Sequence, residues 1–214
     1  LMKIDIITLF PEMFVGPFEW SIVKRAKEKQ LVEIHIHDLR WWATDERKTV
    51  DDRPYGGGAG MVMKVDIIDA AVAELKDKTG DKNTKVILMD AGGKKFNQGL
   101  ARDFALDEHL IVICGHYEGV DHRVHEYIAD EIISVGDYVL SGGELPAMTV
   151  VDSVVRLIPG VVGNPKSLDE ESHNDESVEY PQYTRPEKYK NWEVPKILLS
   201  GDHKKIEDWR KDGE

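Results

Sequence analysis

The chain has 214 residues, 41% of them hydrophobic and 32% charged, which is enough for one full α/β core plus a small appendage. No apolar run approaches the ~20 residues that a membrane span needs, and residues 1–5 lack the pattern of a signal peptide. The net charge of −12 argues by itself against a nucleic-acid partner, because such proteins usually carry a basic face. A nucleic-acid partner would therefore require a local basic cleft or few phosphate contacts.

Hydrophobic periodicity predicts strands and helices that alternate along the first three quarters of the chain. The strands are short, and most are apolar throughout, which is typical of a parallel sheet covered by helices on both faces. His35 and His37 share one face of a predicted strand and are expected to be solvated rather than metal ligands. The predicted strands are 3–10, 31–38, 86–89, 110–114 and 131–135, and the predicted helices are 18–30, 64–78, 99–106, 121–128 and 145–157.

Cys114 is the only cysteine, so no intramolecular disulfide can form, and a reducing cytoplasm is the expected location. It ends an apolar run, which favours a buried, inert thiol over a nucleophile.

The composition changes after Pro159. Residues 163–185 are rich in Asp, Glu, Ser, Asn and Pro without periodicity, which predicts a linker, and helical spacing returns at 194–199 and 204–211. These boundaries divide the chain into a main domain at 1–161, a linker at 162–186 and a short helical segment at 187–214.

Four stretches are too glycine-rich or too polar to be explained by packing. Consecutive glycines let backbone N–H groups approach an anion or a nucleotide closely, although each stretch could also be a flexible loop, an ordinary strand-to-helix turn or a solvated linker. Two of them follow predicted strands, where open α/β sheets bind ligands. The stretches are 49–61, 114–121, 135–146, and 169–173 together with 180–186.

Several common motifs are missing from the sequence. No G-x-G-x-x-G follows the first strand and no G-x-x-x-x-G-K-[ST] exists, which argues against a dinucleotide site and a P-loop. No C-x-x-C or H-E-x-x-H pattern predicts a metal site.

Taken together, the stretches closely resemble the TrmD family, the bacterial tRNA (guanine-N1)-methyltransferases of the SPOUT superfamily. The resemblance covers nearly the whole chain, from the motif at 7–14 through 183–186 to 199–203. Each stretch alone is weak evidence, whereas five in order at family-like spacing are strong evidence.

The resemblance implies an α/β fold of the SPOUT type, with a parallel sheet, a C-terminal trefoil knot and a small helical C-terminal domain that binds tRNA. It also implies a homodimer with active sites at the subunit interface, and S-adenosylmethionine bound in the knot beside the loop 88–91. By position, the residues implied for the cofactor are Leu88, Met89, Gly115, Val135, Gly136, Asp137, Tyr138, Val139, Leu140, Gly142, Gly143 and Pro146.

The implied reaction is methylation of N1 of guanine 37, beside the anticodon. Guanine N1 carries a proton at neutral pH, so the enzyme needs a general base near N1 and a cation near O6. The resemblance makes Arg156 that cation, against the alternative of a helix-end salt bridge. The base is expected to be Glu171, with Asp169 as the fallback, because the family's Glu-Asp-Ser is here Glu-Glu-Ser at 170–172.

The resemblance further implies that the tRNA is contacted by Asp51, Asp52, Arg53, Tyr55, His116 and Glu118. His116 stands where many members carry arginine. Glu118 is also a candidate to recruit Mg²⁺. The sequence stops soon after 209–211, whereas members usually continue, so the tRNA-binding segment is expected to be shorter than usual.

Two alternatives remain at this point. One is a SPOUT enzyme that acts on another RNA, and the stretches around Asp51 and Tyr183 speak against it. The other is a non-catalytic RNA-binding module, against which the acidic charge and the lack of an aromatic-basic RNA motif weigh.

Overall fold

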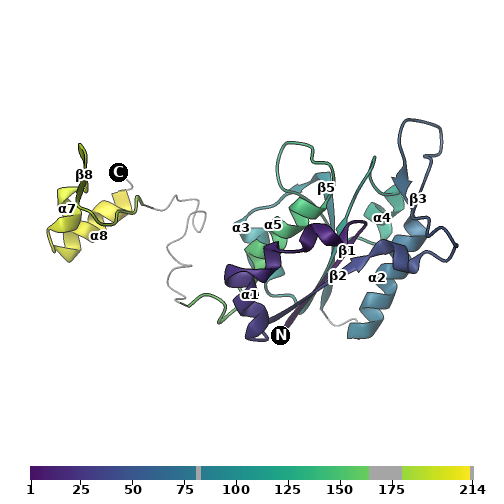
Figure 1. Ribbon diagram of the computed structural model, residues 1–214, viewed down its shortest axis with the longest axis horizontal. Coiled ribbons are helices and arrows are strands. Elements are labelled where there is room, and N and C mark those ends of the chain that lie inside the picture. Colours follow the sequence, from purple (N-terminus) through teal and green to yellow (C-terminus); the bar gives the residue numbers. More distant parts are fainter. Residues whose placement is uncertain (81–82, 164–179, 213–214) are drawn as a thin grey trace. The chain divides into compact units, whose positions relative to one another are not determined.

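The computed structural model describes residues 1–80, 83–163 and 180–212. Contacts between Cα atoms divide the chain into two compact units, Leu1–Gly163 and Asn164–Glu214, and each is described by itself. The first unit is built on a five-stranded sheet with the order β2-β1-β6-β5-β7, in which every neighbouring pair is parallel (Figure 1). This confirms the predicted α/β class with a parallel central sheet. The strands are β1 (Met2–Thr8), β2 (Val32–Asp38), β5 (Thr84–Lys95), β6 (His109–Cys114) and β7 (Glu131–Ser134).

Helices cover both faces of this sheet (Figure 1). Residues of α1, α3 and α5 share one apolar cluster, and residues of α2 and α4 share a second. Successive side chains of a strand point to opposite faces, so Ile4 and Ile6 of β1 join the first cluster while Ile7 joins the second. The helices are α1 (Ser21–Glu28), α2 (Val65–Thr79), α3 (Gln98–Phe104), α4 (His122–Tyr127) and α5 (Glu144–Val155).

The structure departs from two predicted elements. The helix predicted at 18–30 is interrupted: η2 (Pro17–Glu19) ends at Trp20, whose backbone is extended, and α1 starts after it. Strand β5 runs past Met89 to Lys95, with a register shift against β7. Gly93 explains that extension, because a Cβ at this position would lie 2.6 Å from the carbonyl oxygen of Ile132 in β7.

Short elements that periodicity did not predict fill the connections. They are η1 (Pro11–Phe14), η3 (Leu39–Trp42) and the two-stranded pair β3 (Asp51–Asp52) and β4 (Val62–Met63).

The prediction that His37 is solvated was wrong. Its Nε2 atom lies 2.6 Å from one carboxylate oxygen of Asp5, and Nε2 of His109 lies 2.7 Å from the other. The Asp5 side chain is 1% exposed and also pairs with Lys3 at 2.9 Å. Burial by itself raises the pKa of Asp5, but the hydrogen bonds from His109, His37 and Lys3 outweigh it and hold that pKa well below its usual range.

The second unit contains four short elements among its described residues: β8 (Lys188–Tyr189), β9 (Trp192–Glu193), α7 (Lys196–Leu199) and α8 (His203–Asp212). The two helices overlap the segments predicted to be helical. Across both units, no described helix has the length and apolar character required to cross a membrane.

Candidate functional site

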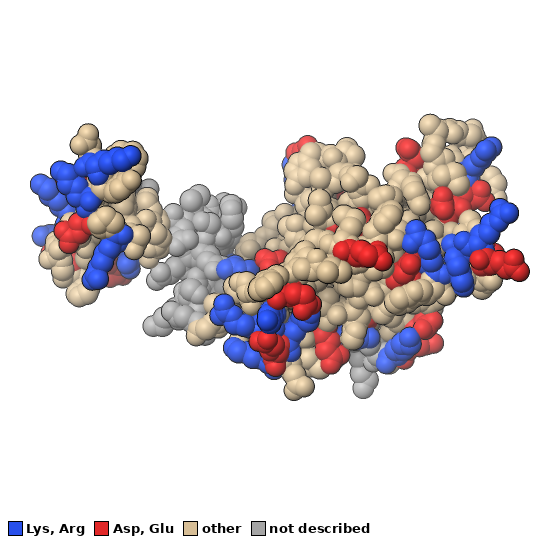
Figure 2. Space-filling model, viewed as in Figure 1, with Lys and Arg blue, Asp and Glu red and all other residues tan. Residues whose placement is uncertain are grey.

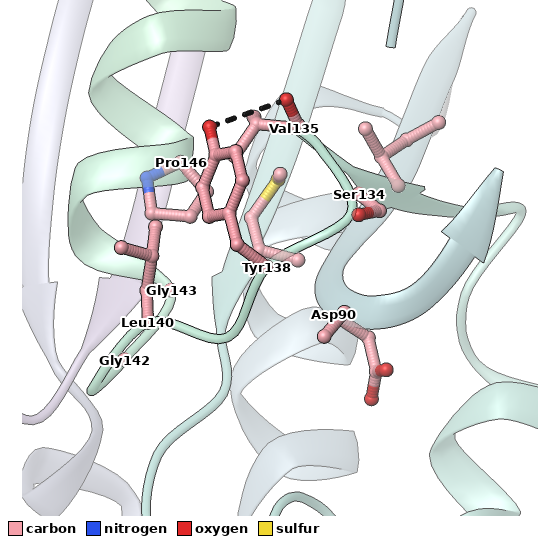
Figure 3. Close-up of a pocket in the computed structure, with 11 residues that line it drawn as sticks. Asp90, Ser134, Val135, Tyr138, Leu140, Gly142, Gly143 and Pro146 are labelled. Carbon is pink, nitrogen blue, oxygen red and sulfur yellow. Dashed lines mark hydrogen bonds between the residues drawn. The ribbon is translucent and has the colours of Figure 1, made fainter. Parts of the chain in front are cut away.

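A cavity of about 80 Å³ opens at the carboxyl ends of β5 and β7, against the start of α5. This is the edge at which open parallel sheets bind ligands. Apolar side chains and glycine backbone form most of its wall (Figure 3). The lining residues are Met89, Asp90, Ala91, Ile133, Ser134, Val135, Tyr138, Leu140, Gly142, Gly143 and Pro146.

The structure brings together seven of the twelve residues that the resemblance implied for the cofactor: Met89, Val135, Tyr138, Leu140, Gly142, Gly143 and Pro146. It also places Asp90 and Ala91 there, although residues 88–91 belong to strand β5 and not to the expected loop. The other five, Leu88, Gly115, Gly136, Asp137 and Val139, do not line the cavity; Leu88, for example, is fully buried in the apolar cluster under α2. Sequence reasoning missed Ile133 and Ser134, although their position at the end of a predicted strand was a usable signal.

Tyr138 closes one side of the cavity. Its ring lies beside Pro146, and its hydroxyl donates to the carbonyl oxygen of Val135 at 3.4 Å (Figure 3). Tyr138 is 58% exposed, and its ring packs against Gly136, where an added Cβ would lie 2.4 Å from the ring. Asp90 points away from the ring and accepts hydrogen bonds from Gly92 N–H and from Nε2–H of His125 at 3.1 Å.

Gly143 crosses the end of β6 at close range. Its N–H donates to the carbonyl oxygen of Gly115 at 2.8 Å, and a Cβ at Gly143 would lie only 2.7 Å from the Cα atom of Cys114. Glycine is therefore required at Gly143, and Gly115 supports the cavity wall from behind.

Glu144 begins α5 directly after this crossing and is buried, with 1% of its side chain exposed. Thr8 Oγ1 donates to its Oε1 atom at 2.8 Å. Nδ1 of His116 lies 3.8 Å from its other oxygen. Burial and, secondarily, the Glu144 charge raise the pKa of the Cys114 thiol well above its usual value, which confirms the expectation of a buried, inert thiol.

The first two glycine-rich stretches also lie side by side. The N–H of Glu118 donates to the carbonyl oxygen of Met61 at 3.1 Å, and Met63 forms a bridge with Val120. A second cavity, of about 720 Å³, lies here and includes Asp52, Arg53 and Tyr55 of the predicted substrate residues.

Arg156 is not in the cavity of its own chain. It is the C-terminal cap of α5, while the N-terminal end of the same helix forms part of the cavity wall. At 1.5 Å of rise per residue, the helix separates the two by about 18 Å. Glu171 and Asp169, the two candidates for the base, lie outside the described residues.

No group of three His, Cys, Asp or Glu side chains that could hold a metal ion occurs within 1–80, 83–163 and 180–212. Acidic residues outnumber basic residues in both units. Residues 1–163 contain 19 Lys and Arg against 27 Asp and Glu, and residues 164–214 contain 9 against 13. Lys and Arg side chains cover much of the visible face of the C-terminal unit (Figure 2).

Comparison with known proteins agrees with this architecture. The sequence model of the family described as tRNA (Guanine-1)-methyltransferase TrmD matches residues 2–214. A tRNA (guanine-N(1)-)-methyltransferase of Carboxydothermus hydrogenoformans is 53% identical, over 98% of this chain and 81% of the relative. Proteins with the same description from Dictyoglomus turgidum (54% identical; 99% of this chain, 84% of the relative) and Pelotomaculum thermopropionicum (52%; 98% and 84%) are similarly close.

Proposed function

The chain belongs to the TrmD family of tRNA (guanine-1)-methyltransferases, and from that premise we propose that it methylates N1 of guanine 37 in tRNA with S-adenosylmethionine. The observation that carries this proposal is the glycine-walled cavity at the ends of β5 and β7, because it lies where the family resemblance puts the methyl donor. The SPOUT trefoil knot and a cytoplasmic location are parts of the same proposal. The close crossing of Gly143 over the end of β6 supports the knot.

The chemical character of the cavity residues suits S-adenosylmethionine. Met89, Val135, Leu140 and Pro146 offer apolar surface to a flat adenine ring, and the glycines leave backbone groups accessible. The cavity volume of about 80 Å³ is below the roughly 300 Å³ typical of small-molecule sites, so we expect the cavity wall to open when the cofactor binds, with the half-exposed Tyr138 ring as the part that moves. When bound, the cofactor supplies a methyl group that is already a good electrophile.

The protein must then prepare the guanine. Glu171, or Asp169 as the fallback, accepts the N1 proton, and the Arg156 guanidinium stabilises the negative charge that develops on O6. Because Arg156 lies about 18 Å along α5 from its own cavity, we assign it to the cavity of a second copy. This assignment makes the active enzyme a homodimer with its sites at the interface.

The tRNA completes each site. Asp51, Asp52, Arg53, Tyr55, His116 and Glu118 contact the nucleotide and its neighbours. The linker 162–186 supplies the base, the domain 1–161 holds the cofactor, and the segment 187–214 contacts tRNA through its exposed lysine and arginine side chains. Recruitment of Mg²⁺ by Glu118 stays a prediction.

Mixed dimers test this arrangement. Arg156→Ala should lower transfer about 10³-fold while calorimetry shows unchanged S-adenosylmethionine affinity, and Gly142→Val should abolish cofactor binding. A heterodimer of the two variants retains one intact site, so it should recover about half of the wild-type rate. No recovery would place Arg156 and the cavity in the same subunit. Arg102→Ala, on the surface of α3, is the matched control and should be fully active.

Substitution of the linker carboxylates identifies the base. Glu171→Gln should be nearly inactive and Asp169→Asn should retain most activity, measured as methyl transfer to a tRNA transcript with guanine at position 37. The reverse order would assign the base to Asp169. A transcript with adenine at that position should accept no methyl group.

A further inference from the structure

His116 and Glu144 face each other in a buried position without forming a hydrogen bond. Nδ1 of His116 is buried and lacks a hydrogen-bond partner, while the nearest carboxylate oxygen of Glu144 is 3.8 Å away. An unpaired buried polar atom destabilises the structure, so a small movement that closes this gap is favourable. Hydrogen bonds at active sites are often long without substrate and tighten in the complex.

The surroundings restrict how the gap can close. Oε1 of Glu144 already accepts a hydrogen bond from Thr8, which leaves Oε2 for the histidine. The rings of Phe10 and Tyr117 flank the imidazole at centroid distances of 4.8 and 5.1 Å. Gly142 passes so close to both groups that any side chain there would collide with Oε2 and Nδ1.

The opposite edge of the imidazole is the one available to a ligand. The side chain of His116 is 21% exposed, yet Nδ1 is buried, so the accessible part of the ring is on the side of Nε2. His116 forms a backbone bridge with Gly142, which lines the cavity. The backbone of His116 therefore lies next to the cavity wall, and Nε2 is the ring nitrogen left for a ligand.

We propose that Glu144 is a positioning residue: it fixes His116 with the proton on Nδ1, so that Nε2 presents a lone pair to a hydrogen-bond donor of the RNA substrate. A carboxylate that binds one ring nitrogen of a histidine determines the tautomer and the orientation of the other nitrogen. The guanine edge that receives the methyl group carries N–H donors, which match an acceptor at Nε2. This inference rests on the proposed function only for the identity of the ligand.

Glu144→Gln inverts the arrangement with little change in volume. The glutamine carbonyl oxygen can still accept from Thr8, but its amide now donates to Nδ1, which moves the ring proton to Nε2. Nitrogen NMR of ¹⁵N-histidine-labelled protein at pH 8.5 distinguishes the two tautomers, and the His116→Gln variant assigns the signal. We expect a protonated Nδ1 in the wild type and a protonated Nε2 in Glu144→Gln.

Kinetics supply the second measurement. Loss of an orienting partner typically costs 10–100-fold, and we expect that loss in kcat/KM for tRNA while the S-adenosylmethionine Kd changes less than about twofold. In a His116→Gln background, Glu144→Gln should cost nothing further, because its effect passes through the imidazole. Glu33→Gln, which removes a carboxylate 3.6 Å from exposed His35, is the matched control and should change neither measurement.

The outcomes separate the inference from the proposed function. A wild-type ring protonated on Nε2, or a full Glu144→Gln penalty that persists in the His116→Gln background, overturns the inference. Because the wild-type spectrum alone reports the tautomer, failure of Glu144→Gln to fold leaves a decisive test. Full activity of His116→Gln would also overturn the inference, while methyl transfer to the transcript would still support the proposed function.

Discussion

Two buried carboxylates meet histidines on opposite faces of β1, and they are satisfied to different degrees. Asp5 is bonded to His37, His109 and Lys3 at 2.6, 2.7 and 2.9 Å. Glu144, which accepts from Thr8 on the other face of the strand, has one hydrogen bond and a histidine at 3.8 Å. A fully paired buried network stabilises the fold, whereas a partly paired one next to a cavity retains capacity for a ligand.

Asp5→Asn should have the largest effect on stability. The substitution leaves three donors around a neutral amide, and breaking a buried charge network by removing one partner costs about 3 kcal/mol. Urea unfolding should show this loss with an unchanged m-value. A loss below about 1 kcal/mol would mean that the network contributes little to stability and that Asp5 and Glu144 do not differ in this respect.

The same carboxylate predicts a pH dependence. Because the pKa of Asp5 is lower in the folded state than in the unfolded state, its stabilisation is fully present above pH ~4 and is lost as the pH falls further. Wild-type stability should therefore fall more steeply below pH 4 than that of Asp5→Asn. Parallel curves from pH 5 to pH 2.5 would contradict the assignment.

Glu144→Gln should cost much less stability, about 1 kcal/mol, because it keeps the Thr8 hydrogen bond and removes a charge with only a distant partner. The comparison separates a stabilising carboxylate, Asp5, from a functional one, Glu144, only if Glu144→Gln loses activity while it remains folded. Thermal unfolding measured on the kinetic samples provides that check.

A loss of similar size is expected at the edge of the Asp5 network, and the smallest effect is expected at its exposed neighbour. His37→Gln should lose about 1 kcal/mol, since its side chain is only 17% exposed and bonds to Asp5. His35→Gln, two residues away on an exposed face of the same strand, should lose nothing measurable. Equal losses would show that strand propensity, rather than the network, is being measured.

The sequence predicted the sheet well because most of its strands contain a buried apolar run, while β2 alternates between buried and exposed side chains. The apolar run before Cys114 could only be a core strand, and β6 is buried throughout. It did not predict the break at Trp20 or the extension of β5 through Gly93, since both depend on contacts with distant residues. Neither carboxylate network was predictable, because Asp5 and His109 are 104 positions apart and no period connects them.

The candidate site was predictable only in part. Glycine pairs after strands indicated the cavity wall, and the family resemblance supplied Met89, Tyr138 and Pro146. That Arg156 would stand about 18 Å from its own cavity follows from the length of α5, a consequence that residue identity alone did not reveal.

The crossing of Gly143 over Cys114 and Gly115 imposes an order on biosynthesis. All five strands of the sheet precede residue 135, but Tyr138, Leu140, Gly142, Gly143 and Pro146 of the cavity wall come after it. A nascent chain that has released only the strands from the ribosome holds no complete pocket, and it also lacks the α5 side chains that cover one face of its sheet. The ability to bind a methyl donor is therefore acquired late in translation, with the emergence of α5.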